Sequence, residues 1–110
     1  MNMNRFELFC MIFYALDASW IDSRSEAVGN YLGDANPFLF ADNGSAVPEI
    51  YDHFCNIIQE DITTENSYDL AVKYIDTLDD KDISEAFHQI NQDDWNSSVS
   101  AYMSSPHKGQ

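Results

Sequence analysis

The densest group of chemically active side chains is an acidic cluster in the second half of the chain. It consists of Asp76, Asp79, Asp80, Asp82 and Glu85, with Lys81 among them. Closely spaced carboxylates are typical Ca²⁺ ligands, but an EF-hand loop also needs a glycine at its sixth position. Counted from Asp76 the sixth residue is Lys81, and counted from Asp80 it is Glu85. We therefore expect no calcium site in this cluster.

Other side chains that perform chemistry are present, but their spacing is poor. The three histidines are far apart, and no Cys-x-x-Cys or His-Glu-x-x-His motif occurs, which argues against a structural zinc. Paired carboxylates could support hydrolysis, and the candidates are Asp17, Asp22, Glu26 and Asp34. A small helical chain rarely forms the deep cleft that this chemistry needs, and no phosphate loop or nucleophile elbow is present. We expect no enzyme, no catalytic residue, no metal and no cofactor.

Helices would position these side chains, because helical periodicity extends over almost the whole chain. Asn2 or Asn4 can cap a first helix that runs to about Ser19 or Trp20. Its residues are apolar over so much of its circumference that we expect the central helix of a bundle. The alternative is that part of this helix meets a second protein chain.

A second helix and a long irregular segment follow. Ser23 and Glu26 have the spacing of a capping box, and Gly33 is expected to end the helix. Residues 34–47 contain the turn signals Asn-Pro and Asn-Gly on either side of the apolar run 38–40, Phe-Leu-Phe. We expect this run to fold back and seal the core, and the alternative is a binding surface.

Four shorter helices are expected after this segment. Pro48 suits the first turn of the third, and the later ones have cap candidates at Thr63 or Thr64, at Asp82 with Glu85, and at Asp93 or Asp94. The sequence therefore predicts an all-α fold, a compact bundle of five or six helices over residues 1–103. Residues 104–110 are expected to form a flexible tail.

The two cysteines and the apolar runs predict a cytoplasmic location. Cys10 and Cys55 each lie in an apolar stretch, which is typical of buried free thiols. A disulfide between them would require their helices to face each other closely. The N-terminal apolar run lacks a cleavage-site pattern and is too short to span a bilayer. We expect no membrane association.

The charge of the chain indicates what kind of partner it binds. Nineteen acidic residues oppose five basic ones, which gives a formal net charge of −14 over 110 residues. Thirteen of the acids and two of the bases fall within residues 49–94. Such a surface repels nucleic acid and is attracted to basic protein surfaces. Direct nucleic-acid binding is therefore not expected.

In size, acidity and helical character the chain resembles the small acidic immunity proteins of bacterial toxin–immunity systems. The resemblance rests on the acidic helical segment 49–94, the helix starting at Ser23 and the stretch 36–40, Asn-Pro-Phe-Leu-Phe. It implies a non-enzymatic inhibitor that neutralises a basic cognate toxin, such as a nuclease, by tight binding. No family residue can be transferred to this chain.

Within that hypothesis we assign a partner-binding site. Tyr68, Tyr74 or Trp95 would be the aromatic anchors, and Asp76, Asp79, Asp80 and Glu85 would form a charged rim. The alternative is that Trp95 and Tyr68 are core residues. Asp76, Asp79 and Asp80 lie near the end of the expected fourth helix, where anions are unfavourable, so a partner would explain them. The alternatives are an acidic nucleic-acid mimic of the anti-restriction or anti-CRISPR type, and a homodimeric adaptor joined through the first helix.

Overall fold

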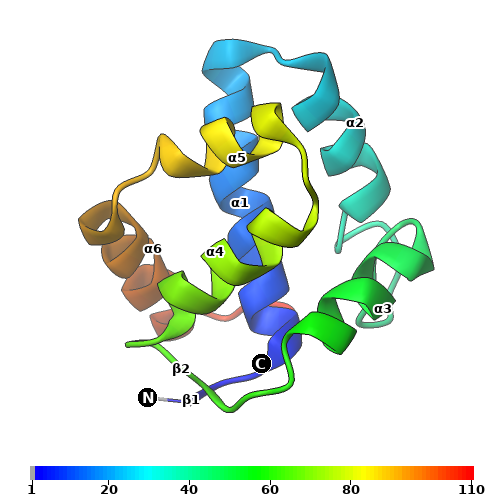
Figure 1. The fold of residues 1–110 in the computed structure, drawn as a ribbon. Helices are drawn as coiled ribbons and strands as arrows, with labels where there is room; N and C mark the ends of the chain where they lie inside the picture. Colours follow the sequence, from blue (N-terminus) through cyan, green and yellow to red (C-terminus); the bar gives the residue numbers. More distant parts are fainter. Residues whose placement is uncertain (1) are drawn as a thin grey trace.

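The computed structural model describes residues 2–110, and it confirms the all-α prediction. In this part of the chain six helices occur: α1 (Arg5–Ser23), α2 (Glu26–Ala35), α3 (Pro48–Ile57), α4 (Ser67–Thr77), α5 (Lys81–His88) and α6 (Gln92–Ser104). Two short strands, β1 (Asn2–Met3) and β2 (Ile62–Thr63), pair antiparallel, with Met3 opposite Ile62. Figure 1 shows the shorter helices arranged around α1.

The first helix is the central helix, as its wide apolar circumference predicted. Asn4 caps it through a capping box: the Glu7 backbone N–H donates to Asn4 Oδ1 at 2.8 Å, and the Asn4 N–H donates to Glu7 Oε1 at 2.9 Å. Each of the other five helices contacts α1. Every residue from Phe6 to Ile12 is buried, so the N-terminal half of the helix is covered on all sides by the rest of the chain.

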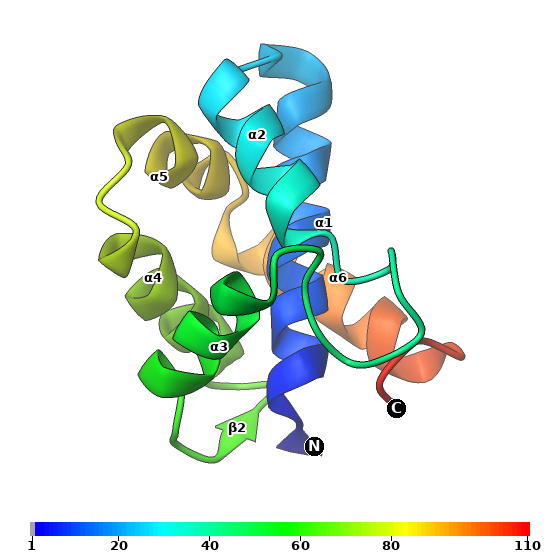
Figure 2. The ribbon, with the colours of Figure 1, turned by 90° about the vertical axis from the view of Figure 1, so that its right-hand side faces the viewer.

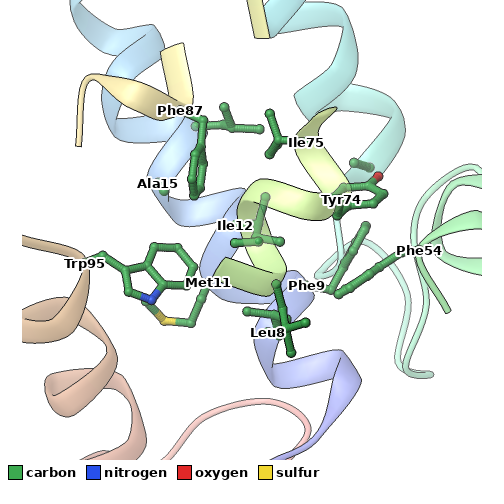
Figure 3. Packing of buried hydrophobic residues seen from close by; sticks show 14 of the residues in the cluster. Leu8, Phe9, Met11, Ile12, Ala15, Phe54, Tyr74, Ile75, Phe87 and Trp95 are labelled. Carbon is green, nitrogen blue, oxygen red and sulfur yellow. The ribbon is translucent and has the colours of Figure 1, made fainter. Parts of the chain in front are cut away.

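The core is rich in aromatic side chains, which form two groups along α1 (Figure 3). In one group Phe9 stacks on Phe54 with ring centroids 5.2 Å apart, and Tyr74 lies 4.9 Å from Phe54. In the other, the ring of Phe87 lies 5.7 Å from that of Trp95. Large rings supply much apolar contact area per residue, which suits a core that must offset the repulsion among many acidic side chains.

Most of the predicted helix starts are displaced by a few residues. The residues at the N-cap positions are Ser25, Asn66, Asp80 and Asn91, in place of Ser23, Thr63 or Thr64, Asp82, and Asp93 or Asp94. The three predicted acidic caps lie in the first turn of their helices, where a carboxylate favours the positive end of the helix dipole. Pro48 starts α3 as expected.

The irregular segment after α2 forms a closed loop and not a core plug. Its ends are joined by two backbone hydrogen bonds, from Val47 N to Asp34 O (2.8 Å) and from Ala46 N to Asn36 O (3.0 Å). This arrangement is that of an Ω-loop. The expectation that residues 38–40 seal the core is wrong, because all three are exposed. The aromatic residues of α1, α3 and α4 already fill the interior.

Residues 104–110, expected to be a flexible tail, lie against the N-terminal end of α1. The His107 side chain contacts Glu7 with Nε2 2.6 Å from Oε2, and both side chains are less than a tenth exposed. Asn4 Nδ2 donates to the Gly109 carbonyl at 2.7 Å. The tail is held because the capping turn of α1 offers it both a buried carboxylate and a side-chain amide.

Two glycines of α2 offer a matched test of helix packing. A Cβ on Gly29 would lie 2.9 Å from Trp20 Nε1, which donates to the Ser25 carbonyl, whereas a Cβ on Gly33 would meet nothing within 4 Å. Gly29→Ala should therefore lower the free energy of unfolding by about 1 kcal/mol or more through overpacking. Gly33→Ala should raise it by up to about 1 kcal/mol, since alanine is the better helix former. Urea denaturation measures both, and stabilisation by Gly29→Ala would contradict this packing.

Candidate interaction surfaces

Two of the predicted partner-binding residues are core residues, which corrects their assignment as anchors. The Tyr74 side chain is fully buried, and its hydroxyl is 2.8 Å from that of Tyr31. Trp95 is equally buried, and its indole N–H donates to Ser67 Oγ at 2.9 Å. A partner cannot reach either ring without opening the core. Tyr68 is half-buried and packs against both Phe87 and Trp95.

The predicted acidic rim lies at the junction of α4 and α5, and part of it has a local structural role. Asp80 is the N-cap of α5, and its Oδ1 accepts hydrogen bonds from the N–H groups of Asp82 and Ile83. Asp79 has a positive φ of 49° in the turn, a conformation that Asp tolerates better than most residues. Asp76 remains exposed in the last turn of α4, where the helix dipole disfavours it. Glu85 pairs loosely with Lys81 at 3.8 Å.

The loop and α1 together form an exposed apolar surface, which was predicted only as the alternative role of residues 38–40. Four large apolar side chains are exposed there: Tyr14 (45%), Phe38 (38%), Leu39 (60%) and Phe40 (58%). The Phe38 ring links the loop to the helix, with its centroid 5.4 Å from that of Tyr14 and 5.8 Å from that of Phe13. We call these four residues the aromatic loop surface. The apolar run 38–40 was its only signal in the sequence.

Hydrogen bonds from distant segments fix the conformation of the loop. Lys108 Nζ donates to the carbonyls of Pro37 (2.5 Å) and Phe40 (2.6 Å). At the other end, Ser45 Oγ donates to the Val47 carbonyl and accepts from the Tyr51 N–H at 3.0 Å. Polar contacts to the loop backbone therefore fix its conformation, while its apolar side chains face solvent.

The acidic junction and the aromatic loop surface lie on different sides of the molecule. Figure 2 shows the link between α4 and α5 on the left side and the loop that follows α2 on the right side, with the body of the domain between them. Carboxylates also occur near the aromatic loop surface. Asp42 belongs to the same loop and is exposed, and Asp17 follows Tyr14 by one turn of α1.

A cleft of about 860 Å³ brings together two groups of acids that are distant in sequence. Asp22 and Glu26, at the α1–α2 corner, line it opposite Asp82 and Glu85 of α5. Ser19 also lines the cleft, and its hydroxyl donates to the Ala86 carbonyl at 2.7 Å. Of the four carboxylates proposed as possible hydrolytic pairs, the cleft holds only Asp22 and Glu26. Within residues 2–110 no group of three or more His, Cys, Asp or Glu side chains is arranged to hold a metal ion.

The thiols differ in burial. Both cysteines are free, as expected, but only Cys10 is fully buried, and Cys55 is half-buried. Burial raises the pKa of the Cys10 thiol to about 11, and the hydrogen bond with Tyr102 and the nearby Lys108 only partly oppose this effect. Cys10 is therefore a neutral thiol at neutral pH and not a thiolate nucleophile.

The few basic side chains contact other groups of the chain, and they form ion pairs with only a small number of its acidic side chains. Lys73 pairs with Glu60 at 2.9 Å, and Arg5 Nη1 donates to the Cys55 carbonyl. Arg24 lies over the Trp20 ring, 4.7 Å from its centroid. Of the nineteen acidic side chains, only Glu7, Glu60 and Glu85 form ion pairs in the described part of the chain. The remaining carboxylates give the surface a strongly negative field.

Comparison with known proteins identifies no relative of this chain. No family model matches the sequence, and no curated protein or solved structure shows significant similarity to it. None of the helices between residues 2 and 110 is both long and apolar enough to cross a membrane.

Proposed function

We propose that the chain is a non-enzymatic inhibitor that binds a protein with a basic surface. Its most specific form is an immunity protein that neutralises a basic bacterial toxin, such as a nuclease, in the cytoplasm. The observation that carries the proposal is the near absence of internal compensation for a net charge of −14. A chain that only needs solubility requires a net charge of about 2–8 in magnitude.

The charge supports a binding role because unpaired surface acids reduce stability through mutual repulsion. A basic partner relieves that repulsion on binding, and the long-range field accelerates the encounter before contact. Asp76 is the clearest instance, since its position at the end of α4 has no local benefit. The acidic nucleic-acid mimic remains the second candidate, because the same negative field would let the chain compete with DNA for the basic binding site of another protein.

Coexpression tests the biological part of the proposal. If the chain is an immunity protein, it should restore growth to cells that express a toxin encoded beside it, and the two proteins should copurify. A mimic would instead compete with DNA for a basic host protein, and no neighbouring toxin would be needed.

For a purified pair, we expect the association rate constant to fall at least about tenfold between 20 mM and 500 mM salt, with a smaller change in the dissociation rate. The wild type is compared with a variant that has three fewer negative charges, Asp22→Asn/Asp52→Asn/Asp76→Asn. Its three positions are exposed and lie outside the first turns of their helices, so no cap is lost. Stopped-flow fluorescence should show slower association and a weaker salt dependence for this variant. Association that does not respond to salt or to these substitutions would contradict the proposal.

A further inference from the structure

We infer that the aromatic loop surface is the contact surface for the partner and inserts its tip, Leu39 and Phe40, into an apolar pocket bordered by basic side chains. The inference rests on the proposed function and names the surface that carries it out. The aromatic loop surface thereby takes the central place in the interface that was predicted for Tyr74, Trp95 and the acidic side chains at the junction of α4 and α5.

The exposure of the tip is the first argument. Leu39 and Phe40 are each more than half exposed although they are adjacent, and Phe38 and Tyr14 extend the same apolar surface onto α1. Single exposed apolar residues are ordinary, but a contiguous apolar group marks a site of interaction. Interfaces typically gain most of their energy from a few such anchors surrounded by polar residues.

The conformation of the loop is the second argument. Lys108 holds the carbonyls of Pro37 and Phe40, and the backbone bonds between residues 34–36 and 46–47 close the base. A loop that is already ordered loses little conformational entropy on binding. These polar contacts therefore hold the apolar tip in one conformation outside the core.

Charge decides between the possible occupants. A second copy of this chain would bring its own charge of −14 to a surface that has Asp17 and Asp42 beside it, with Lys108 as a nearby cation bound to the loop carbonyls. Repulsion between two such molecules opposes a dimer at low salt. A partner with lysines or arginines around an apolar pocket is attracted by the negative charge of the chain and can bury Leu39 and Phe40. Charge complementarity therefore favours such a partner over self-association.

The test uses a library of random short peptides displayed on phage and selected on the immobilised chain at about 20 mM salt. We expect the enriched peptides to combine Lys or Arg with Trp, Phe or Leu. Binding of the most enriched synthetic peptide is then measured by calorimetry against three proteins: wild type, Leu39→Ser/Phe40→Ser, and Ile21→Ser. Ile21 is 57% exposed, like the loop tip, but lies near the end of α1 outside the aromatic loop surface, so it is the matched control.

The loop variant should bind the peptide about 10- to 30-fold more weakly, and Ile21→Ser should bind it as wild type does. Circular dichroism and urea denaturation should show all three proteins to be equally folded, since the substitutions are at exposed positions. Basic peptides that bind the loop variant as tightly as wild type would overturn this surface while leaving the proposed function intact. Enrichment without basic residues, or no enrichment, would overturn this inference, whereas the proposed function is decided by the coexpression and salt-dependence experiments. A wild-type dimer in light scattering that the loop variant loses would assign the surface to a second copy and also overturn the inference.

Discussion

Trp95→Ala should lower the free energy of unfolding by about 3–5 kcal/mol. The indole is buried against the rings of Tyr68 and Phe87, and its N–H is paired with Ser67 Oγ. Alanine would leave a cavity in this group and remove the hydrogen bond. Since small domains have a total stability of about 5–15 kcal/mol, this loss is a large fraction of the total. Circular dichroism during urea denaturation measures the loss.

The conservative variant Trp95→Phe separates packing from a binding role. It keeps an aromatic ring in the core, and Ser67 retains its hydrogen bond to the Thr64 carbonyl at 3.0 Å. We expect a smaller loss, about 1–2 kcal/mol. If Trp95→Ala kept wild-type stability and instead abolished partner binding, the original prediction of an aromatic anchor at this position would be correct after all.

His107→Ala should destabilise the domain by about 1–3 kcal/mol near pH 6, because the Glu7 carboxylate loses its charged partner and keeps only the hydrogen bond from the Asn4 N–H. The same contact should make stability depend on pH. Burial lowers the pKa of His107, but hydrogen bonds to Glu7 and to the Ser105 carbonyl outweigh it, so the pKa is raised above 6.5.

A raised pKa in the folded state fixes the sign of that dependence. The stabilisation from protonated His107 is complete below pH 6.5 and is lost as the pH rises through the raised folded value. Thermal unfolding of the wild type between pH 6 and pH 9 should show this decline, and His107→Ala should show a flatter profile. His88→Ala is the control, since His88 is exposed at the end of α5. A wild-type profile that His107→Ala leaves unchanged would contradict the ion pair.

The sequence predicted the fold well where periodicity was long and poorly where a distant segment decides the outcome. The wide apolar circumference of α1 correctly predicted a central helix. Tyr74 was predicted to be a partner-binding anchor, but it belongs to the single buried stripe of α4, which runs from Ser67 to Ile75, and α3 packs on that stripe through Phe54. Helix starts were misplaced because several polar residues near each start can act as caps, and only the tertiary path of the chain selects one.

The candidate site was harder to predict for the same reason. The turn signals around residues 38–40 were recognised, but an apolar run in a loop can be buried or exposed with equal local preference. Its exposure depends on Lys108, about seventy positions later in the chain, and on a core already filled by other rings. The acids at 76, 79 and 80 looked equally misplaced, yet Asp80 is a cap and only Asp76 lacks a local role.

The central position of α1 also determines how the domain can form during synthesis. Among the described residues this helix leaves the ribosome first, yet the residues that cover it come from every later helix, and the His107–Glu7 contact spans a hundred positions. Such long-range contacts slow folding. A nascent chain therefore carries part of its most apolar helix uncovered until α5 and α6 have emerged, and exposed apolar surface of this kind promotes aggregation.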